Sequence, residues 1–202
     1  MAFIISADDI KKNLPGYDPK HSDVLHRESA RLADKEFEKA LKTRQEIKVI
    51  LMSGGTASGK TEYVSAYLKN RNVIIFDGTL PSFEGAKIKC AKVAKSGKSI
   101  EVHAVMPISL QKAFIAFLNR DRKFPPEHFF RTHSACRKTL LEITREMPAV
   151  TVRVFFSESI ISKDQIDTKF TELSIPNRGV LIEYLEQNQY TENELKQMQG
   201  LL

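Results

Sequence analysis

Residues 54–61 read GGTASGKT and match the pattern G-x-x-x-x-G-K-[ST] at every fixed position. Glycines permit positive φ angles, so successive backbone N–H groups can turn toward one anion. A helix that starts directly after such a loop adds the partial positive charge of its N-terminus. In this pattern the lysine reaches the β- and γ-phosphates of a nucleotide, and the last hydroxyl binds Mg²⁺. The sequence therefore predicts a site for ATP or GTP with Mg²⁺, formed by Gly54, Gly55, Thr56, Ala57, Ser58, Gly59, Lys60 and Thr61.

A single carboxylate follows this phosphate loop. Residues 73–80 read VIIFDGTL, in which an apolar run ends at Asp77, seventeen residues after Lys60. An aspartate at a strand end can hold Mg²⁺ directly or through water, so Asp77 joins Thr61 as a candidate metal ligand. The alternative is structural, because Asp-Gly pairs are favoured in turns. Both interpretations stay open at this point.

Other titratable side chains near the expected cleft have more ordinary explanations. Glu84 and Glu127 are candidates for a general base, but acids in the first turn of a helix are favoured by the helix dipole alone. His128 and His133 have no third ligand at a metal-binding spacing. His103 falls inside a predicted strand, and we expect it at the sheet surface.

The elements around the loop follow from the hydrophobic pattern. Apolar runs predict strands, and apolar residues three and four positions apart predict amphipathic helices. The predicted strands are 47–53, 72–77, 99–106 and 149–156. The predicted helices are 22–45, 60–70, 82–95, 110–120, 126–147, 177–187 and one from Thr191, where Thr191 and Glu194 form a capping-box pair. Strands that alternate with helices predict a three-layer α/β fold with a mainly parallel sheet of about four strands.

The length of 202 residues is typical of one domain with an appendage. We expect residues 1–160 to form the phosphate-binding domain, with the N-terminal helix as part of it. Residues 161–202 are predicted to be a helical C-terminal extension that packs on or beside that domain.

Charge and composition restrict the partners. A formal charge of +6 favours anionic ligands, which include nucleotides. The densest basic run, residues 87–98, has little aromatic interleaving and no accompanying nucleic-acid motif, so a solvated helix face explains it better than nucleic-acid binding. No apolar run has the length of a bilayer, and the start MAFIISADDIKKN resembles neither a signal nor an anchor. With Cys90 and Cys136 far apart, we expect reduced thiols in a cytoplasmic protein without a membrane partner.

Several further segments follow one another in a characteristic order. HRESARLADKEFEKAL precedes the first predicted strand and the loop GGTASGKT. Then come FDGTLPSFEGAKIKCAKVAKSGKSIEVHAVMP, SLQKAFIAFLNR and DRKFPPEHFFRTH. In this order, over about residues 20–157, the chain resembles the zeta toxin family of P-loop small-molecule kinases.

The resemblance implies transfer of a phosphoryl group from ATP or GTP to a nucleotide sugar, UDP-N-acetylglucosamine, and an antitoxin protein as a partner. It assigns Asp77 and Thr79 to the sugar substrate. It assigns Arg120 and Arg122 to a lid that stabilises charge on the transferring group, a role suited to the planar, always charged guanidinium. Lys60, Asp77, Arg120 and Arg122 are thus the predicted catalytic residues.

The chain departs from the family in one respect. Family members have a further strand between the P-loop helix and the strand that ends in acid-glycine-threonine. That strand ends in the aspartate that serves as catalytic base, and a helical segment that covers the substrate follows it. Here the helix after Lys60 runs directly into NVIIFDGT. Either the base strand is deleted or VIIFD is the base strand, and the glycine-threonine, helix and strand that follow favour deletion.

Three hypotheses result. The first is a zeta-toxin-like kinase that phosphorylates a small molecule. The second is a nucleotide-binding module that has lost catalysis and acts through protein contacts, which the missing strand would explain. The third, an NTPase that acts on nucleic acid, rests only on the positive charge.

Overall fold

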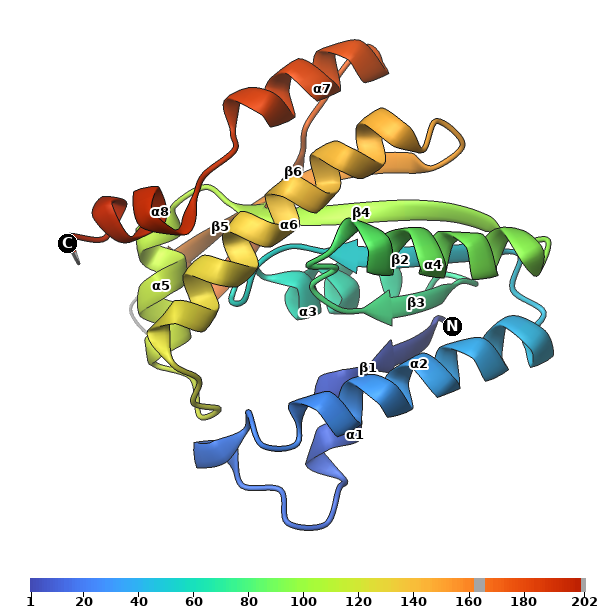
Figure 1. Cartoon of the computed structure of the whole chain (residues 1–202), viewed down its shortest axis with the longest axis horizontal. Coiled ribbons are helices and arrows are strands. Elements are labelled where there is room, and N and C mark those ends of the chain that lie inside the picture. Colours follow the sequence, from blue (N-terminus) through green and yellow to red (C-terminus); the bar gives the residue numbers. More distant parts are fainter. Residues whose placement is uncertain (162–165, 201–202) are drawn as a thin grey trace.

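A six-stranded sheet forms the centre of the computed structural model, which describes residues 1–161 and 166–200 (Figure 1). Its strands lie in the order β1-β3-β2-β4-β5-β6. The first five strands in this order, β1-β3-β2-β4-β5, are parallel to one another, and β6 is antiparallel to β5. The strands are β1 (Phe3–Ser6), β2 (Lys48–Ser53), β3 (Ile74–Asp77), β4 (Ser99–Pro107), β5 (Thr151–Ile161) and β6 (Ile166–Glu172).

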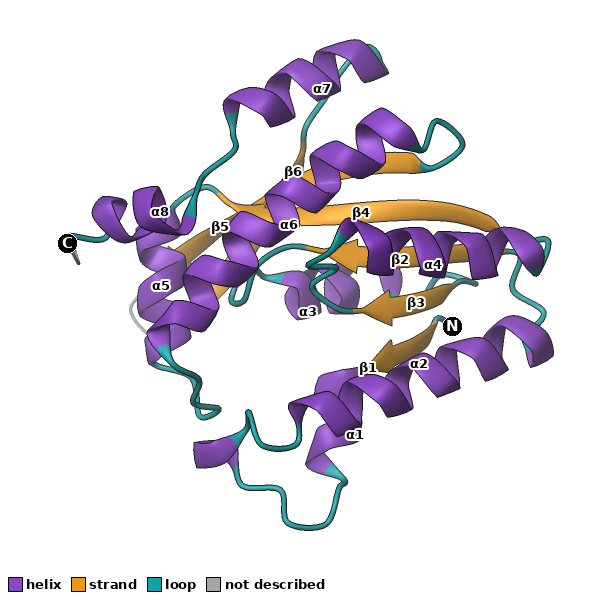
Figure 2. Ribbon diagram, viewed as in Figure 1, coloured by secondary structure: helices purple, strands orange, loops and turns teal. Residues whose placement is uncertain are grey.

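Eight α-helices accompany the sheet in the described part of the chain (Figure 2). They are α1 (Ala7–Lys12), α2 (His26–Thr43), α3 (Lys60–Tyr63), α4 (Phe83–Lys95), α5 (Leu110–Leu118), α6 (Pro126–Glu146), α7 (Arg178–Gln187) and α8 (Glu192–Met198). A short 3₁₀-helix, η1, spans Pro19–His21. A π-helical turn, η2 (Val64–Leu68), continues α3. The predicted capping box of Thr191 and Glu194 is present at the start of α8.

The predicted α/β class and the mainly parallel sheet are confirmed, but the prediction of about four strands is too low. Strands β1 and β6 were not predicted. The run FIIS of β1 has only four residues and pairs with β3, which is distant in sequence, so it carries little local signal. The polar alternation of β6, IDTKFTE, resembles a solvated tail. The segment predicted to be a helical extension therefore also contributes a strand to the sheet.

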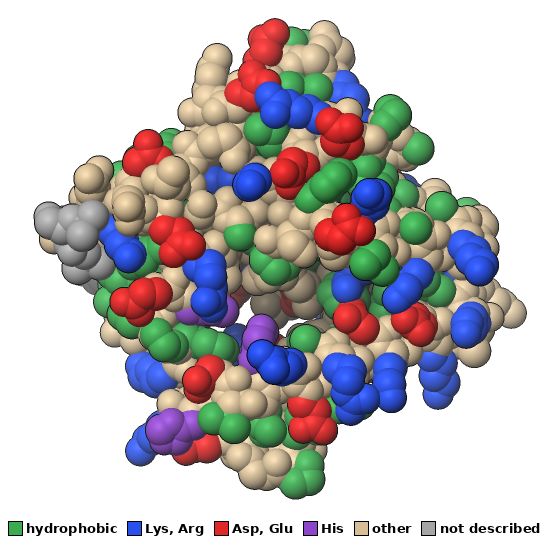
Figure 3. All heavy atoms as spheres, viewed as in Figure 1, with side chains coloured by type: hydrophobic (Ala, Val, Ile, Leu, Met, Phe, Trp, Pro, Cys, Tyr) green, Lys and Arg blue, Asp and Glu red, His purple; other side chains and the backbone are tan. Residues whose placement is uncertain are grey.

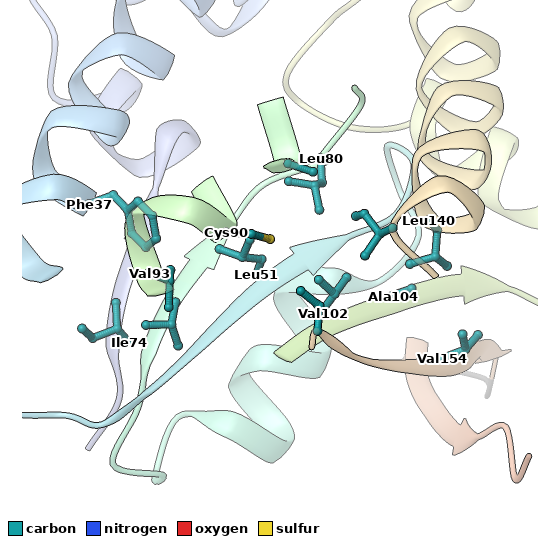
Figure 4. Packing of buried hydrophobic residues seen from close by; sticks show 14 of the residues in the cluster. Phe37, Leu51, Ile74, Leu80, Cys90, Val93, Val102, Ala104, Leu140 and Val154 are labelled. Carbon is teal, nitrogen blue, oxygen red and sulfur yellow. The ribbon is translucent and has the colours of Figure 1, made fainter. Parts of the chain in front are cut away.

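Apolar side chains cover both faces of the sheet, because successive residues of a strand point to opposite sides. On one face, α2, α4, α6 and α7 pack against side chains that include Leu51, Ile74, Val102 and Val154 (Figure 4). On the other face, α3 and η2 pack against the neighbouring residues of the same strands, such as Ile50 and Ile75. The sheet thus lies between two layers of helix.

The position of His103 differs from the prediction. Its side chain is only 2% exposed, because Tyr63 of α3 covers this part of the sheet. The Tyr63 hydroxyl lies 3.0 Å from Nδ1 of His103, and Nε2 lies 2.9 Å from a carboxylate oxygen of Glu101. The expected sheet-surface position was therefore wrong, and the ring belongs to a buried hydrogen-bonded network.

The order of the strands determines where a ligand can bind. Strand β2 has β3 on one side and β4 on the other, so the chain leaves the end of β2 at the point where the direction of the strand order changes. In open parallel sheets, the crevice at such a point, beyond the carboxyl ends of the strands, is the usual ligand site. The phosphate loop, residues 54–61, lies at this point.

Arg178 connects the C-terminal segment to the end of α6. Its guanidinium donates hydrogen bonds to five backbone carbonyls, those of Ile143, Thr144, Met147, Pro148 and Val150, at 2.6–3.3 Å. The last carbonyls of a helix have no partner within the helix. A single side chain therefore caps the end of α6 and holds the turn into β5.

We expect Arg178→Ala to lower the free energy of unfolding by roughly 3 kcal/mol, because several carbonyls lose a charged donor together. Urea denaturation would measure the change. Arg145→Ala is the control, since Arg145 forms a half-exposed ion pair with Glu186, and such pairs contribute at most about 1 kcal/mol. Equal effects of the two substitutions would contradict the capping role.

Candidate functional site

The phosphate loop leaves β2 in a conformation that requires its glycines. Gly54 and Gly59 have φ angles of 137° and 88°, and Ala57 also has a positive φ of 64°. A Cβ on Gly54 would overlap the backbone carbonyl of Val105 in β4. The loop therefore turns tightly against the neighbouring strand, and Gly59 then serves as N-cap of α3.

Lys60 folds back over the loop that precedes it. Its Nζ donates to the carbonyl oxygens of Gly54 and Gly55 at 2.9 and 2.8 Å. Burial lowers the pKa of Lys60, and the nearby carboxylate of Asp77 opposes that shift. Nζ thus lies at the centre of the loop.

Asp77 ends β3 beside the start of α3. A carboxylate oxygen accepts a long hydrogen bond of 3.5 Å from the hydroxyl of Thr61. Burial raises the pKa of Asp77, and Lys60 opposes this effect. The two residues predicted to hold Mg²⁺ are therefore adjacent. A cation between them would favour the charged carboxylate.

A cavity of about 310 Å³ opens next to these residues, and we call it the Asp77 cavity. Its wall contains residues from the phosphate loop, from the segment after β3, from the N-terminal segment and from residues 119–125 between α5 and α6. We call residues 119–125 the lid, after the role that the resemblance implies. The lining includes Asp8, Lys60, Asp77, Thr79, Arg120 and Arg122. The face of the molecule in Figure 3 is hollowed beside histidine and basic side chains. The volume of the Asp77 cavity is in the range of pockets that bind small molecules.

Asp8 is a cavity residue that sequence reasoning missed. It follows β1 by two residues, and the pairing of Ser6 with Asp77 brings it to the same edge of the sheet. Arg122 of the lid forms an ion pair with its carboxylate. Burial alone would raise the pKa of Asp8, but Arg122 and Lys11 outweigh this effect and keep the pKa below its usual value. An acid after the apolar run FIIS was the available signal.

The two lid arginines have different surroundings. Arg122 is bound to Asp8, whereas Arg120 lines the Asp77 cavity and a second cavity of about 190 Å³. This second cavity, which we call the Ser109 cavity, also contains Ala57, Ser109, Glu158 and Thr168. It lies on the β5 side of the loop. The loop therefore lies between two cavities, and Arg120 borders both.

The remaining candidates are divided between the surface and the cavity. Glu84 and Glu127 are exposed first-turn acids of α4 and α6 and lie outside the lining of the Asp77 cavity. His128 lines the cavity and stacks on Phe124, with ring centroids 4.6 Å apart. Burial lowers the pKa of His128 to about 4, so its ring is neutral at physiological pH.

His133 of α6 contacts the phosphate loop at Thr56. Its ring is 2% exposed, and Nε2 lies 2.9 Å from the carbonyl oxygen of Thr56. Burial lowers the pKa of His133 to about 3, so the ring is neutral and Nε2 carries the hydrogen that the carbonyl accepts. A histidine considered only as a metal ligand in the sequence is a support of the phosphate loop in the structure.

Comparison with known proteins does not identify a family. No protein-family model matches the chain, and no curated protein matches it. In the described residues there is no cluster of three or more histidine, cysteine or acidic side chains that could hold a metal ion. Mg²⁺ that arrives with nucleotide phosphates needs only one or two protein ligands. None of the helices described is long and apolar enough to cross a bilayer.

The low pKa of His133 predicts a dependence of stability on pH. The folded pKa lies below the ordinary 6.5, so the unfolded chain binds a proton first, and stability falls as the pH falls below about 6.5. Between pH 7 and pH 5 this group should account for a loss of about 2 kcal/mol. We expect His133→Gln to remove that part of the loss, measured by urea denaturation at both pH values.

A matched control is His21→Gln, because His21 is 73% exposed at its side chain. It should retain the pH dependence of the wild type. The assignment to His133 would be contradicted if both variants showed the same loss between pH 7 and pH 5.

Proposed function

We propose that the protein is a P-loop phosphotransferase, which moves the γ-phosphoryl group of ATP or GTP, with Mg²⁺, to a small-molecule acceptor. The observation that carries this proposal is the Asp77 cavity, where Lys60 of the phosphate loop and the carboxylates of Asp8 and Asp77 line one space. A phosphate loop alone would support only binding or hydrolysis. A loop that borders a cavity lined by carboxylates supports transfer to a second molecule.

The phosphate loop would bind the nucleotide. The backbone N–H groups of Gly59, Lys60 and Thr61 have no hydrogen-bond partner in the described part of the chain, so they are free to bind phosphate oxygens. Lys60 would move from the loop carbonyls to the β- and γ-phosphates. Thr61 and Asp77 would hold Mg²⁺ between them and the phosphates.

Asp8 would serve as the general base. The acceptor oxygen attacks the γ-phosphorus, the bond from this phosphorus to the β–γ bridging oxygen breaks, and the nucleoside diphosphate leaves with that oxygen. Asp8 takes the proton of the acceptor hydroxyl. Its low pKa keeps it ionised, and the transfer of Arg122 from Asp8 to the phosphoryl group would make it a stronger base.

The role proposed for Asp8 is that of the catalytic aspartate for which the resemblance to zeta toxins finds no counterpart in this chain. The family strand that ends in the catalytic aspartate was interpreted as deleted. We propose that β1, which pairs with β3 and is followed by Asp8, stands in for that strand from the other end of the chain. The acceptor proposed from the resemblance is a nucleotide sugar, UDP-N-acetylglucosamine, with Thr79 as a further contact. An antitoxin would be the protein partner.

Arg120 is the better placed of the two arginines for charge stabilisation in the present conformation. It borders the Asp77 cavity, in which the phosphoryl group would be transferred, whereas Arg122 is held by Asp8. If β1 supplies the base, the alternative of a module without catalysis loses the argument from the missing base strand.

We expect Asp8→Asn to lower kcat for phosphoryl transfer by about a hundredfold to ten-thousandfold, because a general base typically contributes that factor. Its affinity for MgADP should stay within about threefold of the wild type. The assay is transfer of label from γ-labelled ATP to a panel of nucleotide sugars and nucleosides. Lys60→Ala should abolish the transfer.

Asp9→Asn is the matched control, because Asp9 is the next residue, is 68% exposed at its side chain and pairs with Lys12 on the surface. It should react like the wild type. Unchanged turnover in Lys60→Ala would refute the kinase proposal, and unchanged turnover in Asp8→Asn would refute only the base. Nucleotide binding without a labelled product on any acceptor would favour the module that acts through protein contacts.

A further inference from the structure

Helix α6 holds the phosphate loop through the backbone of Thr56. The N–H of Thr56 donates to Oγ1 of Thr132 at 3.1 Å. The carbonyl of Thr56 accepts from Nε2 of His133 at 2.9 Å. Because Thr132 and His133 are consecutive residues of one helix, the peptide groups on both sides of Thr56 are fixed to the same rigid element.

The hydroxyl of Thr132 is fully used in this arrangement. It donates its hydrogen to the carbonyl of Phe129 at 3.0 Å, which leaves its lone pairs for Thr56. The hydroxyl of Thr56 lies 3.1 Å from the same Oγ1 and is therefore the donor in that contact. Thr132 itself is only 5% exposed, so no water replaces these bonds easily.

The ring of His133 also limits the path of the loop at Gly55. A Cβ on Gly55 would overlap the imidazole ring. The ring in turn packs on Phe129, with centroids 4.2 Å apart, so it has little freedom to move away. The backbone at Gly55 and Thr56 therefore lies directly on α6.

The later part of the loop is different. The N–H groups of Gly59, Lys60 and Thr61 have no hydrogen-bond partner within the described residues. Thr56 is thus attached to α6, and the carbonyl of Ser58 accepts from Oγ of Ser157 in β5 at 2.7 Å, while the amides from Gly59 onward present unpaired donors. The direction of those donors therefore depends on both attachments, of which the one at Thr56 is made by α6.

We propose that Thr132 and His133 are positioning residues of the nucleotide site. They fix Thr56, and this directs the amides from Gly59 onward at the phosphates. The inference rests on the proposed nucleotide binding. It adds two residues outside the sequence motif, neither of which touches the ligand.

The test is the affinity of the full-length protein for MgADP, measured by titration calorimetry at pH 7.5. Thr132→Val keeps the shape of the side chain and removes both hydrogen-bonding functions, and we expect about tenfold weaker binding. Thr132→Ser restores the hydroxyl and should bind within about twofold of the wild type. A second pair, His133→Leu and His133→Gln, compares a side chain without a donor with one that retains it.

Thr144→Val is the matched control. Thr144 is a buried threonine of the same helix, and its hydroxyl donates to the carbonyl of Leu140, four residues earlier, at 2.7 Å. It makes the same chemical change away from the loop, so MgADP affinity should not alter. In a two-dimensional ¹H–¹⁵N spectrum without ligand, the amide of Thr56 should shift in Thr132→Val and not in Thr144→Val.

Calorimetric stoichiometry separates weaker binding from a misfolded fraction, because a misfolded fraction lowers the number of sites and leaves their affinity unchanged. Weaker binding in Thr132→Val with rescue by Thr132→Ser is the expected result. Wild-type affinity in Thr132→Val and His133→Leu would overturn the positioning role while nucleotide binding stands. A wild-type protein that does not bind MgADP would overturn both this inference and the proposed function.

Discussion

The candidate site depends on the parallel pairing of β1 with β3. Ser6 lies opposite Asp77 in this register, so the chain leaves β1 at the same edge of the sheet at which β3 ends. Asp8 and Asp77 consequently border one cavity, although 68 residues separate them. A shift of one residue in β1 would turn the buried Ile5 toward the opposite face, so burial of that side chain helps to fix the register.

Contacts between the N-terminal segment and the lid form one wall of the Asp77 cavity. The N–H of Lys123 donates to the carbonyl of Pro19 at 3.0 Å, and Arg122 pairs with Asp8. Lys11 is fully buried, with its ammonium 5.2 Å from the ring centroid of Phe124 and 3.5 Å from the carboxylate of Asp8. A buried lysine needs such partners, because an unpaired charge would be costly there. The lid, which leads directly into α6, thus connects the cavity wall to the helix beneath the phosphate loop.

The parts of the site that were predicted are local in sequence. The phosphate loop is a run of eight residues, 54–61, and its strand and helix follow from apolar runs and spacing, so these predictions needed no tertiary information. Asp8 was missed because β1 is short and its pairing partner is remote. His133 was missed as a support of the loop because a histidine on a helix does not reveal, from spacing alone, that a glycine will lie against it.

The place of β1 in the chain matters less than its place in the sheet. A site beyond the carboxyl ends of the strands requires only that these ends lie side by side. The outermost strand of the sheet can come from either end of the chain. The connection after β1 must then return to the amino ends of the strands, where β2 begins. Helix α2 has 18 residues and is therefore about 27 Å long, which exceeds the length of the six-residue β2. Helix α2 is long enough to make this return, so β1 and β3 can pair side by side although they are not consecutive in the chain.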